Sequence, residues 1–382
     1  MDLCWSDEQE LLRRTARETL ERECPMSRVR AAMDDAGEAR EEIWKTLAGL
    51  GWTGLALPTA HGGAGLGLAE LTVLLEEMGR VLLPAPFFSS CVLGGLAVLL
   101  AGDEAQRARW LPGIASGERR ASLALLGEEG SWDPPALALP AHPDGDPLRL
   151  SGRRLFVPDA ANAQQLLVPV QPASGEPCLA LVETDAPGLS VRPMAFLDAT
   201  RPVAEVHFEE VAVSTERVLA SGRAAWLPAL LDRARLALCA EMVGGAERVL
   251  ELSVAFARTR EQFGRPIGSF QAIQHKCADM LVQLEGARSA TWAAACALDA
   301  EAPDAHLAVC VAKAWCSDAY RTITGEGIQI HGGQGFTWEQ DLQLYFKRAR
   351  ASEVAFGDAP FHREEIARLL VDDPAALEHG FS

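Results

Sequence analysis

Arginine side chains gather at a break between two predicted helices. Before the break, apolar residues recur at three- to four-residue spacing from Val249 to Phe256, which is typical of a helix that buries one face. The break, Phe263–Pro266, contains a glycine that can adopt positive φ and a proline that restricts φ, and Ser269 can cap the next helix. A helix start beside Arg258 and Arg260 can bind a pyrophosphate, although such arginines are more often solvated or paired with acids.

The elements that must position these side chains fall into three zones, which we expect to be domains. Residues 1–117 have helical periods, residues 118–220 contain short strand-like runs separated by Pro, Gly and Asp, and residues 221–382 return to long helical periods. This pattern predicts an α+β protein with a small β domain between two helical domains. The chain has 382 residues, 48% of them hydrophobic, which is enough for two or three domains with substantial cores.

Charge and composition exclude several classes of function. A formal net charge of −18 argues against a general nucleic-acid or anionic-membrane binder, because phosphate surfaces attract Lys and Arg. The first residues lack the features of a signal peptide, and no apolar run approaches the ~20 residues that span a bilayer, so we expect a cytoplasmic protein. The cysteines form no Cys-x-x-Cys pair and the histidines have no metal-ligand spacing, so we predict reduced thiols and no metal.

Five segments carry a resemblance to a known family: residues 44–52, 58–67, 76–80, 258–280 and 328–336, the last reading IQIHGGQGF. In this order they resemble the acyl-CoA dehydrogenase family, nearly from end to end of the chain. The resemblance implies an N-terminal α-helical domain, a middle small β-barrel or sandwich domain and a C-terminal four-helix bundle. It also implies FAD and the α,β-dehydrogenation of an acyl-CoA or other acyl thioester, in which a carboxylate takes the α-proton and the flavin takes the β-hydride.

The resemblance places the pyrophosphate and adenine of FAD on two of these segments, the first of which is expected to reach into a neighbouring subunit. Glycines in the second segment would let its backbone approach the ligand, whereas the alternative is a plain helix end followed by a loop. An aromatic ring of the β domain can stack on the flavin. The residues at the cofactor-binding positions are Arg260, Phe263, Gln271, Gln329, Gly332, Gly333 and Phe156.

At the flavin edge the sequence departs from the family. Leu126 and Pro158 stand where family members usually have threonines. Pro158 has neither a hydroxyl nor an N–H, so it cannot give the hydrogen bond that the threonine gives to the flavin. An ordinary strand and turn is the alternative interpretation of these residues.

The position of the catalytic base departs further. Counted from Gly332, Phe356 occupies the place of the glutamate in most family members, and Ala234 occupies the alternative place on an earlier helix. Neither side chain can accept a proton, and a general base is typically worth about 10²–10⁴-fold in rate. Asp358 is the best replacement base because it lies two residues from Phe356.

Other candidate residues at this site are weaker. Glu353 is expected to be a helix-surface acid, Glu241 to satisfy a buried polar contact, and His362 to be structural. Arg235, which follows Ala234, is the one residue that the resemblance carries over toward binding of the thioester substrate.

Three hypotheses follow. The chain is an FAD-dependent dehydrogenase with an unusual base, or it is a subunit with little chemistry of its own that completes the FAD site of a base-bearing homologue, or it is a fold relative that performs a dehydration or a flavin-linked oxygenation. The second pattern is known in the family, where α2β2 assemblies act on bulky substrates such as steroid side-chain CoA thioesters. In either of the first two cases we expect a homo-oligomer or a pair of homologous subunits, because the signature arginine would otherwise have no cofactor to reach.

Overall fold

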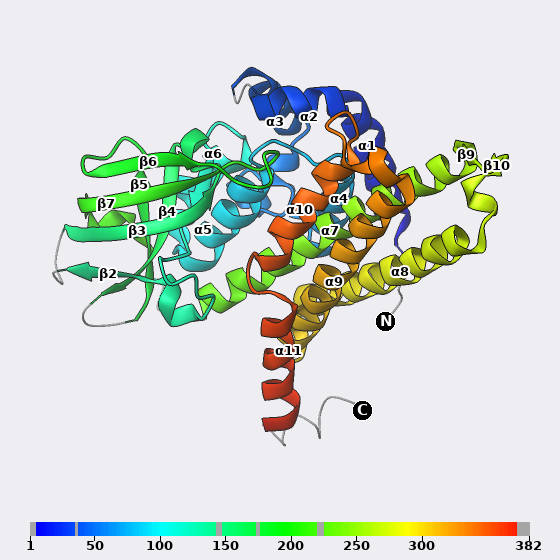
Figure 1. Ribbon diagram of the computed structural model, residues 1–382. Coiled ribbons are helices and arrows are strands. Elements are labelled where there is room, and N and C mark those ends of the chain that lie inside the picture. Colours follow the sequence, from blue (N-terminus) through cyan, green and yellow to red (C-terminus); the bar gives the residue numbers. More distant parts are fainter. Residues whose placement is uncertain (1–4, 35–36, 143–146, 173–175, 220–224, 373–382) are drawn as a thin grey trace. The chain divides into compact units, whose positions relative to one another are not determined.

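The computed structural model describes residues 5–34, 37–142, 147–172, 176–219 and 225–372 (Figure 1). The chain packs as two compact units. The first comprises Met1–Arg30, Gly67–Leu83 and Arg235–Ser382, and the second comprises Ala31–Leu66 and Pro84–Ala234. Helices α2 (Met26–Asp34) and α7 (Trp226–Thr259) run from one unit into the other.

The first unit is helical. Its elements are α1 (Asp7–Glu23), α4 (Leu68–Arg80), most of α7, the strands β9 (Glu261–Gln262) and β10 (Arg265–Pro266), α8 (Gln271–Asp299), α9 (Ala305–His331), α10 (Leu342–Val354) and α11 (Ala359–Ala367). In Figure 1 the β9–β10 hairpin joins the ends of α7 and α8, and α8 and α9 lie side by side. Among the described residues, no helix is long and apolar enough to cross a membrane.

Helices α4 and α7 approach each other through two glycines. A Cβ added at Gly244 of α7 would lie 1.7 Å from the carbonyl oxygen of Glu76, and a Cβ added at Gly79 of α4 would lie 2.1 Å from that of Glu241. Each helix thus places its backbone in the space left by a missing side chain on the other. Any larger residue at either glycine would force the two helices apart.

The second unit combines helices with a sheet. Its helices are α3 (Glu38–Gly49), α5 (Leu96–Ala101) and α6 (Glu104–Ala115). Its strands are β1 (Ala121–Leu123), β2 (Leu139–His142), β3 (Leu148–Pro158), β4 (Gln165–Pro172), β5 (Cys178–Glu183), β6 (Leu189–Met194), β7 (Val203–Val213) and β8 (Val218–Leu219). The strands form one sheet in the order β6-β7-β3-β2-β4-β5-β8, with β1 paired to β4.

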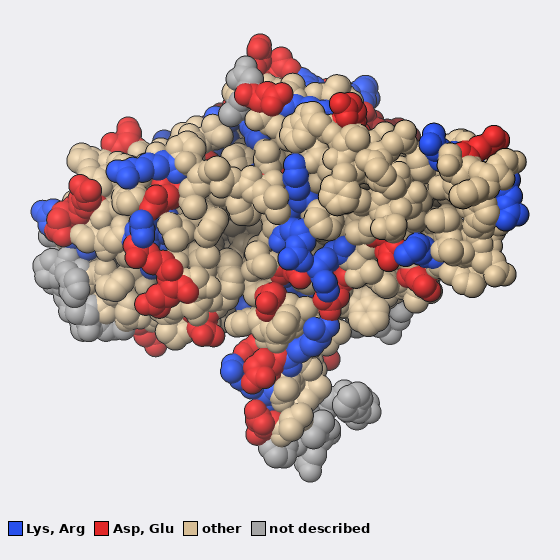
Figure 2. Space-filling model, in the orientation of Figure 1, with Lys and Arg blue, Asp and Glu red and all other residues tan. Residues whose placement is uncertain are grey.

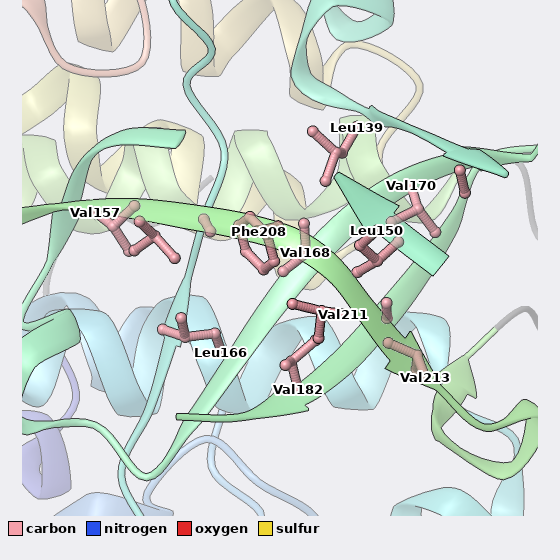
Figure 3. Packing of buried hydrophobic residues seen from close by; sticks show 14 of the residues in the cluster. Leu139, Leu150, Val157, Leu166, Val168, Val170, Val182, Phe208, Val211 and Val213 are labelled. Atoms are coloured by element: carbon pink, nitrogen blue, oxygen red, sulfur yellow. The ribbon is translucent and has the colours of Figure 1, made fainter. Parts of the chain in front are cut away.

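The sheet encloses an apolar core. Side chains from several strands point toward one another, among them Val157, Leu166, Val168, Val182 and Phe208 (Figure 3). In the first part of β3, buried and exposed residues alternate, as expected for a strand with one face on a core. Register shifts at Leu150–Gly152 and Arg154–Val157 mark irregularities where β3 pairs with β7. The second of these shifts surrounds Phe156, a predicted flavin contact.

The predicted fold class is confirmed: helices come first, a sheet follows, and long helices end the chain. The strand-like runs that the sequence predicts at residues 121–126, 148–156, 165–170, 179–182 and 203–208 correspond to β1, β3, β4, β5 and β7. Strands β2, β6 and β8 were not predicted: β8 has two residues, and in β6 the side chains are half-buried or exposed, so it shows no alternation of buried and exposed positions. The domain boundaries at residues 117/118 and 220/221 stay predictions.

Candidate functional site

The break between α7 and α8 is a short β-hairpin. Its two loop residues, Phe263 and Gly264, have φ values of 55° and 76°, as the type I′ turn of a two-residue hairpin requires. Phe263 is 91% exposed, and its ring meets the edge of Phe270 at 6.1 Å between centroids. The Arg265 guanidinium lies 4.1 Å from the centre of the Phe270 ring. The hairpin therefore presents an ordered aromatic and cationic tip.

Helix α8 begins without a side-chain cap. The prediction that Ser269 caps it is wrong, because the Ser269 hydroxyl donates to the carbonyl of Pro266 at 2.7 Å. Phe270 is the N-cap residue and has no side chain that can accept from the first turn. The exposed Gln271 is the first helical residue, so the first amides of a 29-residue helix stay available to an anion. Figure 2 shows Lys and Arg side chains at this hairpin end.

The second predicted segment lies at the end of α9. Gln329 is exposed on the last turn, and Gly332 leaves the helix with φ of 60°. A Cβ at Gly332 or Gly333 would meet no atom within 4 Å, so this backbone is open to a ligand. His331 stacks on Phe256 of α7 with 4.1 Å between ring centroids, which ties the end of α9 to the helix that carries the hairpin. The two segments are thus carried by helices that touch near their ends.

At the predicted flavin edge in the second unit, Phe156 presents an aromatic side chain, and neither Leu126 nor Pro158 carries a hydroxyl. Phe156 has φ of 52°, is 43% exposed and lies 5.9 Å from the Phe196 ring. The Leu126 carbonyl accepts from the N–H of Leu155 at 2.8 Å. The Pro158 carbonyl accepts from the hydroxyl of the buried Ser122 at 2.5 Å. Of these three residues only Phe156 has an aromatic ring to offer, and its contact with a flavin stays a prediction.

The expected base position lies in the turn between α10 and α11. Phe356 is only 6% exposed and has φ of 59°, a conformation that bulky side chains rarely adopt. The next residue, Gly357, has φ of 98°. Asp358 is the N-cap of α11, and its carboxylate accepts from the N–H of Phe361 at 2.9 Å. This cap contact directs one oxygen of the carboxylate to the helix, and the use of Asp358 as a base stays a prediction.

Cationic and neutral donors from three helices bind the carbonyls of this turn. The Phe356 carbonyl accepts from Nε of Arg235 at 3.2 Å and faces Nε2 of His362 at 3.1 Å. The Gly357 carbonyl accepts from Nζ of Lys313 at 2.8 Å. Arg235, predicted to bind substrate, is buried and contacts the protein backbone here. This group of Arg235, Lys313 and His362 is called the turn anchor below.

Burial shapes the ionisation of the turn anchor. It lowers the pKa of His362 to about 3, helped by the charges of Arg235 and Lys313, so His362 is neutral and donates from Nε2. Burial also lowers the pKa of Lys313 to about 8. His362 was expected to be structural, and Lys313 was not predicted from the sequence. A sequence signal existed, since helical spacing places Lys313 on the same face as the apolar Val309 and Cys316, and the structure shows that face to be buried.

The weaker acid candidates have other partners. Glu353 contacts Arg350 at 2.5 Å and Arg321 at 3.3 Å, as expected for an acid on a helix surface. Glu241 is buried, and its backbone lies against Gly79. Among the described residues, no group of three or more His, Cys, Asp or Glu side chains is arranged to hold a metal ion.

The residues present fit one part of FAD better than the other. The uncapped start of α8, the exposed Arg260 and the open glycines at the end of α9 suit a pyrophosphate and its adenosine. At the flavin edge, the side chains of Leu126 and Pro158 offer no hydrogen bond, and Phe156 offers only a ring face. FAD bound here would supply the hydride acceptor, and the residues of this chain would mainly hold its nucleotide end.

Comparisons with known proteins find relatives that match nearly the whole chain. Residues 6–118 match the family model for the acyl-CoA dehydrogenase N-terminal domain, and residues 221–371 match that for the C-terminal domain. Acyl-CoA dehydrogenase IpdE2 of Mycobacterium tuberculosis is 34% identical over 364 residues, covering 95% of this chain and 96% of the relative. Acyl-CoA dehydrogenase FadE27 of the same species is 31% identical over 342 residues, covering 87% and 89%.

Solved structures are similar over the whole chain. A variant of the Tcur3481-Tcur3483 steroid ACAD has 35% sequence identity and a TM-score of 0.87, covering 97% of this chain and 99% of that one. The ChsE4-ChsE5 complex from Mycobacterium tuberculosis has 29% identity and a TM-score of 0.89, covering 98% and 100%. With two family models matched and relatives above 30% identity over nearly its full length, this chain belongs to the acyl-CoA dehydrogenase family, whose members are FAD-dependent oxidoreductases.

Proposed function

We propose that this chain is the subunit without a catalytic base in a heteromeric acyl-CoA dehydrogenase. It would complete the FAD site of a base-bearing homologous partner that oxidises a bulky acyl-CoA, such as a steroid-derived thioester, in the cytoplasm. The observation that carries the proposal is Phe356 at the expected base position, buried and with its carbonyl held by Arg235 and His362. A phenylalanine in such a setting has no group that can take the α-proton.

The distribution of the other predicted site residues supports the division of labour. The nucleotide-side residues Arg260, Phe263 and Gln271 are exposed on a projecting hairpin and helix start, where another subunit can meet them. The flavin-edge positions Leu126 and Pro158 lack hydroxyls. A chain with this combination retains the part of the site that serves a neighbour and lacks the part that serves its own chemistry.

The relatives point the same way. Two of the structures similar to this chain are described as the Tcur3481-Tcur3483 steroid ACAD and the ChsE4-ChsE5 complex, and each description names two components. Pairing with a homologous chain and a steroid-type acyl thioester are therefore the assembly and the substrate class that we infer here.

Dehydrogenation by this chain with Asp358 as the base is the competing proposal. It requires the Asp358 carboxylate to serve a substrate while it accepts from the N–H of Phe361. Asp358→Asn separates the two proposals, because asparagine can still cap the helix but cannot act as a base. A loss of about 10²-fold or more in activity of the purified chain would favour Asp358, and unchanged activity of an assembled complex would favour the base-free subunit.

The decisive experiment is expression of the chain alone and together with a base-bearing homologue from the same genome. We expect the chain alone to retain little flavin and the co-purified complex to show a flavin spectrum that substrate bleaches. Native mass spectrometry should find both chains in the complex. Stoichiometric flavin that substrate bleaches in the chain alone would overturn the proposal.

A further inference from the structure

Lys313 closes the turn between α10 and α11. It lies on α9 with no exposed surface, and its Nζ contacts the Ser317 hydroxyl at 3.0 Å, the Glu353 carbonyl at 3.1 Å and the Gly357 carbonyl at 2.8 Å. These three acceptors match the three N–H donors of an ammonium group. Glu353 belongs to the last turn of α10, and Gly357 follows the strained residue, so one side chain joins the two sides of the turn.

The conformation of Phe356 needs such support from outside the turn. A non-glycine residue at positive φ is strained, and strain of this kind persists only where the surrounding structure determines it. The Phe356 carbonyl is engaged by Arg235 from α7 and His362 from α11, while Lys313 engages the neighbouring carbonyl from α9. Three helices therefore act on two consecutive peptide units.

None of these anchoring contacts uses the side chain of residue 356. The acceptors are the backbone carbonyls of Phe356, Gly357 and Glu353. Gly357 is itself required, because a Cβ there would lie 2.5 Å from Cδ1 of Phe361 and 2.9 Å from Nε2 of His362. The backbone at position 356 is thus determined by its neighbours, whatever side chain it carries.

We propose that Lys313 is the positioning residue for the α10–α11 turn. We further propose that the turn anchor keeps the backbone of residue 356 in the conformation that would position an acid there for catalysis. In this view the chain has lost the base as a side chain but has kept the structure that would hold it. The catalytic part of this inference rests on the proposed function, because it takes position 356 to face the reacting acyl group. The positioning part does not depend on that function.

Hydrogen exchange of the full-length chain tests the positioning part. In Lys313→Met, the amides of residues 355–362 should exchange about tenfold faster or more than in the unaltered chain, because two carbonyls of the turn lose their donor. Lys313→Gln keeps two N–H donors without the charge and should restore part of the protection. The matched control is Lys276→Met, which removes an ion pair with Glu326 on α8 and α9 and should leave residues 355–362 unchanged.

Unchanged exchange at residues 355–362 in Lys313→Met, or acceleration that is equal throughout the chain, would overturn the inference. If Lys313→Met fails to fold, Lys313→Gln and Ser317→Ala carry the same measurement. Ser317→Ala removes one acceptor of Lys313 but leaves both carbonyl contacts, so it should affect these amides less than Lys313→Gln. The opposite order would contradict the role given to Lys313.

Kinetics of the assembled complex test the catalytic part. Phe356→Glu should give the subunit a dehydrogenase activity of its own, measured with the partner's base removed. Adding Lys313→Met should lower that kcat about tenfold while KM changes by less than about twofold, since a displaced base affects the transition state more than substrate binding.

Faster exchange in Lys313→Met without any activity of Phe356→Glu would contradict the proposed function and the catalytic part, and would leave Lys313 as the positioning residue of the turn. An active Phe356→Glu that is insensitive to Lys313→Met would contradict the positioning part alone.

Discussion

The hairpin tip and the α10–α11 turn hold the same kind of strained residue by opposite means. Phe263 and Phe356 have φ of 55° and 59°, but the first is 91% exposed and the second 6% exposed. The strain at Phe263 is set locally, by a two-residue loop between paired strands. The strain at Phe356 is set by donors on α7, α9 and α11, two of which lie far from the turn in sequence. A turn whose conformation is set by its own residues can be exposed and contact a partner. A turn whose conformation depends on contacts with surrounding helices must stay buried.

A matched pair of glycine substitutions gives the largest expected contrast. Gly357→Ala should lower the free energy of unfolding by about 3–4 kcal/mol or prevent folding, because the added Cβ would meet Phe361 at 2.5 Å. Gly264→Ala should cost only about 1 kcal/mol, since it adds strain at φ of 76° but no collision. Urea unfolding measures both. Equal losses of stability would show that local backbone strain alone determines the cost of both substitutions.

Acid should weaken the turn and leave the hairpin intact. The pKa of His362 is about 3 in the folded chain against about 6.5 when unfolded, so the unfolded chain binds more protons between these values. Stability from this group is complete above pH 6.5 and is lost as the pH falls toward 3, by up to about 5 kcal/mol.

The pH dependence of unfolding measures this loss. His362→Gln should flatten the curve between pH 6.5 and 3, and His275→Gln, on the exposed side of α8, should not. A curve that keeps its slope in His362→Gln would mean that another group senses the acid.

Removing the hairpin's cation should affect the cofactor rather than the fold. Arg260 is exposed, so Arg260→Ala should change the free energy of unfolding by less than about 0.5 kcal/mol. In the complex with a partner we expect FAD to bind about tenfold more weakly, as when a charge-assisted hydrogen bond is lost. Flavin fluorescence during dilution reports the affinity, with Arg22→Ala on α1 as the control. Unchanged affinity would remove the hairpin from the cofactor site.

The smallest expected effect separates the cap from the base. Asp358→Ala should cost about 1 kcal/mol of stability by removing the N-cap of α11, and Asp358→Asn should cost a few tenths at most. Thermal unfolding of the two variants is sufficient. Equal losses in Asp358→Asn and Asp358→Ala would show that the charge of Asp358, and not its capping bond, matters at the turn.

The turn between α7 and α8 could be predicted from sequence because its causes are neighbours in the chain, whereas its two short strands, β9 and β10, were not predicted. A local preference for a turn is encoded by the Phe-Gly pair and the proline after it, and a preference for a helix by the apolar period of α7. The cap of α8 was predicted wrongly for a local reason as well: Ser269 bonds back to Pro266, three residues earlier, before it can reach the helix.

The turn anchor could not be predicted because its members are distant in sequence. Arg235, Lys313 and His362 come from three helices. The sequence around each of them does not indicate which carbonyl it binds. Counting from Gly332 identified Phe356 as the residue at the base position, but not its positive φ or its burial. The positive φ and the burial of Phe356 arise from tertiary packing, which local sequence patterns do not reveal.

The missing side-chain cap of α8 would couple cofactor binding to the order of that helix if FAD binds there as proposed. A helix without an N-cap side chain leaves its first amides to water, and its first turn is correspondingly prone to open. A pyrophosphate at that end would act as the missing cap, so the free energy of binding would also stabilise the helix. Loading of the flavin and closing of the subunit contact would then be one equilibrium, and an assembly that loses its FAD should separate into its chains more readily.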